Sequence, residues 1–235
     1  MEYSDNGWES SARAWITDMA EAGDYSRRHV LDAPMLARLR RGHYASALDV
    51  GCGEGRFCRM MRAEGIEPTG IDPAPTLLAT AQDRDPGGRY LSARAEALPF
   101  GADSFDLVVS YLTLIDIDDI DAALAEMTRV LRPGGTLLIA NLNSFSTAGE
   151  WVRDETGRAR LVIDDYLTPR AEWVSWRGIS IRNWHRPMHR YMQALIGCGL
   201  RLVHFDEPAP DDADPDRAER FRRCPYFHIM EWHKS

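Results

Sequence analysis

A glycine-rich segment near the start of the chain constrains the fold more than any other feature of the sequence. A short apolar stretch, residues 45–50, runs directly into Gly51-Cys52-Gly53-Glu54-Gly55, and apolar residues at helical spacing follow it. Glycines at alternate positions let a strand turn sharply into a helix and bring bare backbone against a ligand. The segment therefore predicts a strand–turn–helix unit with a binding site at the turn.

The rest of the chain repeats this alternation of short apolar runs and helical patterns. Strands separated by helices at this spacing form a parallel sheet that is covered on both faces. The last two runs are joined by an acidic, proline-rich loop, which indicates a wide hairpin and therefore an antiparallel last strand. We expect an α/β fold, Rossmann-like and doubly wound, with a seven-stranded sheet. The predicted strands are 45–50, 69–72, 89–92, 105–110, 136–140, 200–205 and 225–232.

The charge balance and the cysteines restrict the functional class. The chain has 28 Lys and Arg against 36 Asp and Glu, a net charge of −8, which disfavours a nucleic-acid backbone or an anionic membrane as partner. No apolar run approaches the ~18 residues that span a bilayer, and the polar, acidic start is unlike a secretory signal. The four cysteines are scattered without a C-x-x-C pair. We expect a cytoplasmic protein with neither a disulfide framework nor a structural zinc.

The spacing of the loop and two acids indicates the kind of ligand. A nicotinamide loop of the form G-x-G-x-x-G would need glycine at position 56, which is Arg56 here. Asp49 lies inside the strand before the loop, and Asp72 closes the second strand, where a carboxylate can accept both hydroxyls of a ribose. A pyrophosphate would instead require a helix N-terminus. The pattern favours an adenosine joined to a cationic amino-acid end, and a nicotinamide oxidoreductase is disfavoured.

Four segments in register resemble the successive motifs of the class I S-adenosylmethionine-dependent methyltransferases. The resemblance covers roughly residues 45 to 140, and the final strand pair extends it to the C-terminus. It implies S-adenosyl-L-methionine as cofactor, S-adenosyl-L-homocysteine as its product, and methyl transfer to an oxygen, nitrogen or carbon of a small molecule. The alternative is a non-catalytic S-adenosylmethionine-binding partner or regulatory domain. The four segments are 48–55, 70–72, 105–110 and 131–135.

The resemblance also implies roles for individual residues. Gly51 and Gly53, with Cys52 between them, would pass close to the methionine part of the cofactor, and Asp49 would lie near its ammonium group. Asp72, which is followed by Pro73, would hold the ribose. Ala95 and Glu96 would contact the adenine, and Ser110 would face the cofactor at the end of the fourth strand. The expected cofactor residues in these segments are Asp49, Gly51, Cys52, Gly53, Asp72, Pro73, Ala95, Glu96 and Ser110.

We expect one methyltransferase domain over residues 1–235, with four parts. An N-terminal helical lid (1–44) would carry Arg28 or Tyr25 over the carboxylate of the cofactor, although a surface basic pair explains the same residues. The cofactor-binding core and an aromatic-rich substrate insertion after the fifth strand follow the lid, and the chain closes with a helix and the final strand pair. These last three parts are residues 45–140, 141–186 and 187–235.

The acceptor side is predicted from the insertion and the segment that follows it. Residues 183–191 resemble a His-Arg-Pro stretch found in a subgroup of bacterial small-molecule methyltransferases, so His185 becomes the candidate general base or acceptor-orienting group. The other interpretation is that His185 caps a helix or bonds a backbone carbonyl. The tryptophans of the insertion suit a flat, apolar acceptor pocket, or they form the core of the insertion.

Several partners are predicted to be absent. The acids at 116–119 are explained by helix capping, so we expect no metal. The segment 110–113 after the fourth strand is unlike the Asn-Pro-Pro-Tyr motif of nucleic-acid methyltransferases. We therefore expect a small-molecule acceptor with an aromatic or apolar surface, no nucleic acid and no membrane. The chain would act as a monomer or a homodimer.

Overall fold

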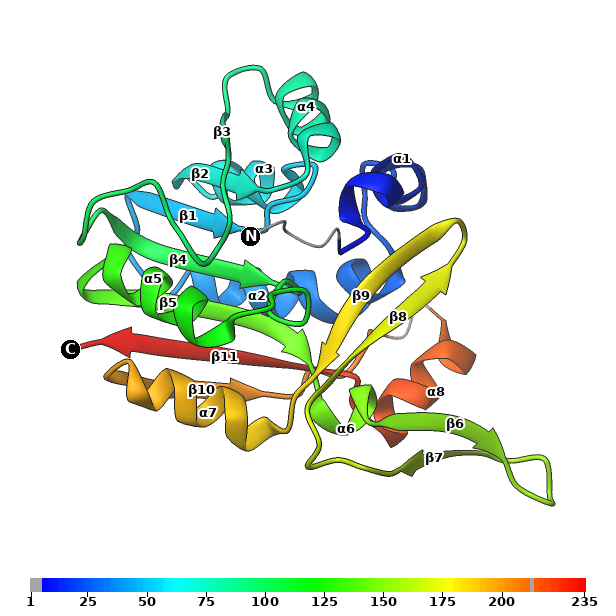
Figure 1. The fold of residues 1–235 in the computed structure, drawn as a ribbon. Coiled ribbons are helices and arrows are strands. Elements are labelled where there is room, and N and C mark those ends of the chain that lie inside the picture. The colour runs from blue at the N-terminus through cyan, green and yellow to red at the C-terminus, as the bar shows by residue number, and fades with distance from the viewer. Residues whose placement is uncertain (1–5, 212–213) are drawn as a thin grey trace.

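A seven-stranded sheet organises the protein, as the sequence predicts. The computed structural model describes residues 6–211 and 214–235, and its sheet has the strand order β10-β11-β5-β4-β1-β2-β3. Strand β11 runs antiparallel to both of its neighbours, whereas the other adjacent pairs are parallel (Figure 1). The strands are β1 (Ser46–Val50), β2 (Glu67–Asp72), β3 (Arg89–Ser92), β4 (Phe105–Tyr111), β5 (Leu131–Leu142), β10 (Leu200–Asp206) and β11 (Phe227–Lys234).

Helices cover both faces of this sheet, because the central strands are apolar on both sides. One core lies between the sheet and α5 (Ile120–Val130) with α7 (Met188–Gly197). The other lies between the sheet and α2 (Asp32–Leu39) with α3 (Arg56–Ala63). Alternate residues of β4 enter opposite cores, as the side-chain period of a strand requires. The doubly wound, Rossmann-like expectation is confirmed.

The N-terminal segment forms a cover over the carboxyl ends of β1 and β4 (Figure 1). It consists of α1 (Trp8–Met19) and a wide helical turn, η1 (Arg27–Leu31), followed by α2. Helix α1 packs against α4 (Pro75–Arg84) through a small apolar cluster, and Glu9 accepts a hydrogen bond from the backbone N–H of Thr76 at 3.1 Å. These contacts fix the cover on the side of β2.

The insertion after β5 is built from two hairpins rather than from one aromatic core. The first hairpin projects away from the sheet, and the second rises beside α1 (Figure 1). The second hairpin is tied to α1, because the Ser11 hydroxyl donates to Ser180 O at 2.9 Å and the N–H of Arg182 donates to Asn6 O at 2.9 Å. The elements are α6 (Ser144–Thr147), β6 (Gly149–Arg153), β7 (Ala159–Ile163), β8 (Arg170–Trp176) and β9 (Ile179–His185).

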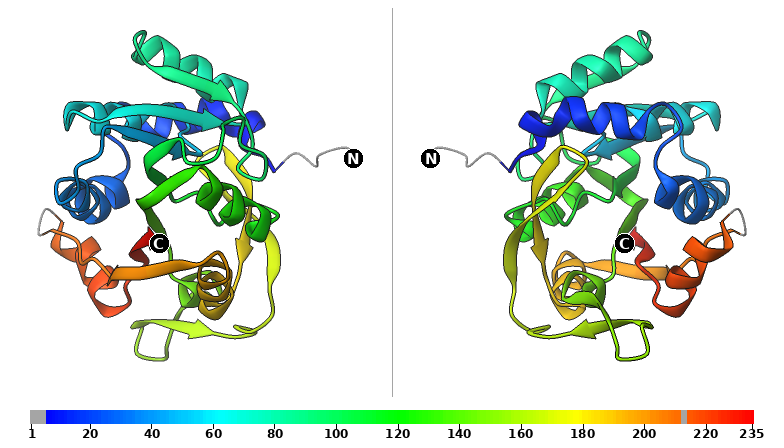
Figure 2. Two further views of the ribbon diagram at one scale, coloured as in Figure 1. Left: turned by 90° about the vertical axis from the view of Figure 1, so that its left-hand side faces the viewer. Right: turned by 90° about the vertical axis from the view of Figure 1, so that its right-hand side faces the viewer.

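The connection between β10 and β11 contains a helix that the sequence analysis treats as loop. Helix α8 (Pro215–Arg223) begins after Asp214, whose carboxylate caps it by accepting from the N–H of Arg217 at 3.1 Å. It lies beside η1 and α2 (Figure 2), where the N–H of Asp211 donates to His29 O at 2.9 Å. Among the described residues, no helix is long and apolar enough to cross a membrane.

Candidate active site

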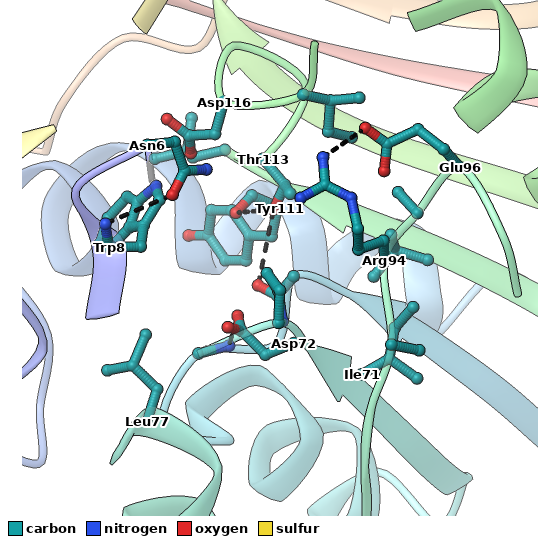
Figure 3. A pocket seen from close by; sticks show the side chains of 18 of the residues that line it. Asn6, Trp8, Ile71, Asp72, Leu77, Arg94, Glu96, Tyr111, Thr113 and Asp116 are labelled. Atoms are coloured by element: carbon teal, nitrogen blue, oxygen red, sulfur yellow. Dashed lines mark hydrogen bonds and ion pairs between the residues drawn. The ribbon is translucent and has the colours of Figure 1, made fainter. Parts of the chain in front are cut away.

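The main cavity opens at the carboxyl ends of β1 and β4, which is the point where the strand order reverses. Ligands of open α/β sheets bind at this switch point. The cavity (Figure 3) holds about 710 Å³ of empty space. A second, smaller hollow adjoins it beside the glycine turn. Its lining includes Asn6, Trp8, Trp15, Arg27, Gly51, Gly53, Asp72, Pro73, Leu77, Arg94, Ala95, Glu96, Tyr111, Thr113 and Asp116.

The glycine turn gives the cavity its backbone wall. Gly51 and Gly53 have φ values of +74° and +55°, a region that side-chain-bearing residues rarely occupy. A Cβ at Gly51 would lie 2.3 Å from the side chain of Thr113, so the turn and the loop after β4 need a glycine there to approach each other. A Cβ at Gly53 would meet nothing within 4 Å, because it would point into the cavity. The bare backbone at Gly53 is therefore space for a ligand.

Asp72 fixes this turn and faces the cavity at the same time. One carboxylate oxygen accepts from the N–H of Gly53 at 2.9 Å, and the other accepts from the N–H of Ala74 at 2.8 Å. Each carboxylate oxygen has a second lone pair, so two further donors can bind from the cavity side. Burial raises the pKa of Asp72 to about 6, so the group is ionised at neutral pH.

Asp49 presents an unsatisfied acceptor to the smaller hollow. Its side chain is 1% exposed, one carboxylate oxygen accepts from the thiol of Cys58 at 3.4 Å, and the other oxygen has no partner. Burial raises its pKa to about 7. A buried acceptor without a donor is costly, and a cationic ligand group would satisfy it. The hollow also contains Cys52 and the two cavity glycines.

The cover is clamped to the glycine turn by Arg56, which occupies the place of the third glycine in a nicotinamide loop. Its guanidinium pairs with the carboxylate of Asp32 in α2 and donates to Ala22 O at 3.0 Å. The hydroxyl of Tyr111 also donates to Asp32, at 2.9 Å. Arg56 therefore supports the position of the cover over the cavity.

The structure places Arg27, and not Arg28, in the cavity. The Arg27 guanidinium lies 4.9 Å from the centre of the Trp15 ring and is paired with Asp24 at 3.0 Å, whereas Arg28 is exposed and outside the cavity. The predicted contact of Arg28 with the cofactor is therefore not supported. Neighbouring residues of a helical turn point in different directions, and the sequence pattern does not show which of the two arginines faces the cavity.

Ser110 does not face the cofactor side of the cavity, in contrast to the prediction. It is fully buried, its hydroxyl has no partner, and it is absent from the cavity lining. Side chains alternate along β4, so Tyr111 reaches the cavity while Ser110 points into the core under α5. Pro73, Ala95 and Glu96 do line the cavity, and Glu96 accepts from Arg94 at 2.9 Å.

His185 lies outside the cavity, in a buried position between α6 and the segment that joins the two hairpins of the insertion. It is 3% exposed, and both ring nitrogens are engaged: Nε2 donates to Tyr166 O at 2.8 Å, and Nδ1 accepts from the Thr147 hydroxyl at 2.7 Å. Burial lowers its pKa, in keeping with a neutral ring. The geometry does not support the predicted catalytic role. The alternative, a bond to a backbone carbonyl, is what the structure shows.

We expect His185→Ala to lower stability and leave the cofactor affinity unchanged. The change removes the partner of two partly buried groups, a loss of about 1–3 kcal/mol, so the melting temperature should fall by several degrees at pH 7.5. The deficit should shrink at pH 5.5, because there the wild type must keep an imidazole neutral that is protonated when unfolded. Thermal melts and calorimetry with S-adenosylhomocysteine measure both quantities. Weakened cofactor binding in a stable variant would contradict this structural role.

The tryptophans that line the cavity come from α1 and not from the insertion. Trp8 and Trp15 pack edge to face, with ring centres 4.9 Å apart. Of the insertion tryptophans, Trp173 is 57% exposed and Trp151 lies under the guanidinium of Arg220. The aromatic rings of the cavity are therefore not those of the insertion, where they were expected. The sequence shows which residues are aromatic, but it does not show that α1 folds over the sheet and brings its tryptophans to the cavity.

The side of the cavity opposite the glycine turn carries a polar group that the sequence analysis assigned to capping. Asp116 lies in the loop after β4 and faces the cavity together with Asn6, Trp8 and Thr113 (Figure 3). Asn183 of β9 donates to one carboxylate oxygen of Asp116 at 2.6 Å, and the side chain of Trp8 also donates to this carboxyl. The neighbouring Asp119 is the residue that caps α5.

These features define a class I S-adenosylmethionine-dependent methyltransferase: a seven-stranded sheet with an antiparallel last strand, a glycine turn after β1 and an acid at the end of β2. The cavity suits this cofactor. The unpartnered oxygen of Asp49 is an acceptor for a cationic amino-acid end, and the open space at Gly53 admits a ligand against the backbone. Among residues 6–211 and 214–235, no group of three His, Cys, Asp or Glu side chains could hold a metal ion.

Comparisons with known proteins agree with this class. Residues 48–139 match the family described as "Methyltransferase domain". The malonyl-[acyl-carrier protein] O-methyltransferase of Salmonella typhimurium is 40% identical over 186 residues, which cover 76% of this chain and 73% of the relative. The protein of the same name from Serratia marcescens is 41% identical over 164 residues, covering 67% of this chain and 64% of the relative.

A solved methyltransferase structure is also similar to this chain. The S-adenosylmethionine-dependent methyltransferase of Mesorhizobium loti is 28% identical, covers 84% of this chain and 96% of its own length, and superposes with a TM-score of 0.75. The chain belongs to the class I S-adenosylmethionine-dependent methyltransferase family, and S-adenosylmethionine is its cofactor.

Proposed function

We propose that the protein methylates a small molecule that enters the main cavity between α1 and the loop after β4. The observation that carries this proposal is the division of one cavity into two sides. Gly53 and Asp72 form the side with the predicted cofactor residues, next to the hollow that contains Asp49, and Trp8 and Asp116 belong to a side that no cofactor motif claims. An acceptor on that second side would lie next to the cofactor under one cover.

The division also assigns roles to the chain's own residues. Asp49 would bind a cationic amino-acid end, Asp72 would accept two ribose hydroxyls, and the segment with Ala95 and Glu96 would contact the adenine. When bound, S-adenosylmethionine supplies a methyl group that is already activated on a sulfonium, so alignment of the acceptor is a large part of catalysis. The indole rings of Trp8 and Trp15 offer rigid apolar area for an acceptor with an aromatic or apolar surface.

A labelling experiment tests this proposal. The protein is incubated with methyl-labelled S-adenosylmethionine and a bacterial metabolite extract, and labelled products are identified by mass spectrometry. Label in a small molecule is the expected result, and a protein with intact cofactor affinity that labels nothing would contradict it. Gel filtration of the same preparation distinguishes the monomer from the homodimer.

Malonyl-[acyl-carrier protein] is the second candidate acceptor, because curated relatives at about 40% identity carry that name. Malonyl-[acyl-carrier protein] should therefore be tested as a defined acceptor in the labelling experiment. The cavity wall carries two charged groups that a free carboxylate would meet: the ionised form of Asp116 would repel it, and the guanidinium of Arg27 would attract it. We also propose a cytoplasmic location, which the four free cysteines support.

We expect Asp72→Ala to weaken S-adenosylmethionine and S-adenosylhomocysteine alike. The variant loses two acceptors for the ribose and the bond that holds Gly53, and each hydrogen bond to a charged group contributes about 1.5–3 kcal/mol. The dissociation constants should rise tenfold or more. Calorimetry with both compounds measures the effect, with Asp85→Ala as a control at a carboxylate outside the cavity. Equal affinities in Asp72→Ala and the wild type would exclude the proposed ribose contact.

A further inference from the structure

The carboxyl of Asp116 is a chemically distinctive group on the acceptor side of the cavity. Residue 116 as a whole is partly buried and its side chain lines the cavity, whereas the two other acids of the same loop, Asp118 and Asp119, are exposed and engaged elsewhere. Two neutral donors, from Asn183 and Trp8, hold it in place. Two donors leave lone pairs free on a group with about four acceptor sites. The held carboxyl can therefore accept one more hydrogen bond, from a group inside the cavity.

We propose that Asp116 is the general base of the reaction and that the acceptor is a molecule with a proton on its nucleophilic atom, a hydroxyl or an amine. This inference rests on the proposed function above. The acceptor's X–H donates to Asp116; as the bond from X to the methyl carbon forms, the carbon–sulfur bond breaks, its electron pair stays on sulfur, and the proton passes to the carboxylate. The balance needs no oxidant, metal or further reactant.

The surroundings of Asp116 suit a base that works near neutral pH. Removal from water raises the pKa of this carboxyl to about 8, and the charge of Asp72 across the cavity acts in the same direction. The Trp8 and Asn183 donors and the positive charge of Arg27 act in the opposite direction. The further charged groups on the cavity wall are Glu96 and Arg94, which pair with each other. A base whose pKa lies near the working pH transfers protons most effectively.

The rival explanation is that Asp116 only ties α1 and β9 to the loop after β4. Asp116→Asn separates the two roles, because the amide oxygen still accepts from Asn183 or Trp8 while the basic group is lost. Asp119→Asn is the matched control: it makes the same charge change in the same loop, outside the cavity, and asparagine caps a helix as well as aspartate does.

The experiment combines labelling with binding. Wild type, Asp116→Asn and Asp119→Asn receive methyl-labelled S-adenosylmethionine and a bacterial metabolite extract, and products are treated with mild alkali, which hydrolyses methyl esters but spares methyl ethers and N-methyl groups. We expect alkali-stable label that falls about 10²-fold or more in Asp116→Asn and stays at the wild-type level in Asp119→Asn. Calorimetry should show S-adenosylhomocysteine affinity within about twofold of wild type in both variants. The wild-type rate should rise with pH as Asp116 ionises, and this rise should vanish in Asp116→Asn.

Four results would overturn the proposal. Alkali-labile label would show a carboxylate acceptor, and an undiminished rate in Asp116→Asn would show that no base acts at this position; both leave the proposed function standing. A lost cofactor affinity in Asp116→Asn would show a structural tether. Wild-type protein that binds S-adenosylhomocysteine but labels nothing would instead contradict the proposed function, and this inference with it.

Discussion

Gly53→Val should abolish S-adenosylmethionine binding while the protein stays folded. A Cβ at this position meets no protein atom within 4 Å, so a valine side chain has room, but the room is the cavity itself. The branched side chain would occupy the volume along the bare backbone that we assign to the cofactor. We expect at least a 100-fold loss of affinity for S-adenosylmethionine and S-adenosylhomocysteine, measured by calorimetry on protein whose circular dichroism matches the wild type.

Gly65→Val is the matched control for backbone strain. Gly65 also has a positive φ, +82°, and open space around its Cβ position, but it ends α3 and lies outside both hollows. Both variants force a β-branched residue into a left-handed conformation, at a cost of about 1–3 kcal/mol. If the two variants bound the cofactor equally well, the glycine turn would not be its site. If both variants failed to fold, backbone strain would be the cause, and cofactor exclusion would not have been measured. Gly53→Ala, which adds only a Cβ to the same position, would then be used to measure the loss of cofactor affinity.

The parts of the fold that the sequence predicts are those that depend on local patterns. The strand before Gly51 and the acid that closes β2 are separated by one helix, so a short-range pattern brings Gly53 and Asp72 together. All seven sheet strands carry their apolar runs in the sequence, and the antiparallel last strand follows from its hairpin connection.

The parts that the sequence does not predict depend on packing between distant elements. Asp116 becomes a cavity group only because Asn183, 67 positions later, donates to it and α1 folds over it. His185 resembles an accessible base in the sequence, yet the insertion covers it and its ring nitrogens bond Thr147 and Tyr166. A polar residue at the end of an element has several possible partners, and tertiary contacts decide among them.

Asp49→Asn should raise the stability of the cofactor-free protein at pH 8 and weaken cofactor binding. Folding raises the pKa of this buried carboxyl from 3.8 to about 7. The folded state therefore favours the protonated form, and stability is lost as the pH rises from about 4 through 7. The full shift corresponds to up to ~4 kcal/mol, because one pKa unit is about 1.4 kcal/mol. Asparagine carries no charge at any of these pH values, so the variant avoids this loss.

We expect the melting temperature of Asp49→Asn to exceed that of the wild type by roughly 5–10 °C at pH 8, with the difference vanishing near pH 4. Asp106→Asn is the control of opposite sign. Hydrogen bonds from Ser46, Ala45 and Arg132 lower the pKa of Asp106, so its ionised form stabilises the fold and the substitution should lower the melting temperature at pH 8.

The cofactor affinity of Asp49→Asn shows whether the charge of Asp49 serves a ligand. The affinity of Asp49→Asn for S-adenosylhomocysteine should fall at least tenfold at pH 8, because the charge that destabilises the free protein is the charge that receives the ammonium group. Calorimetry and thermal melts on one preparation measure both. If the variant gained stability without losing affinity, the charge of Asp49 would not bind the ammonium group of the cofactor. A variant that lost affinity without gaining stability would show that folding does not raise the pKa of this carboxyl in the free protein.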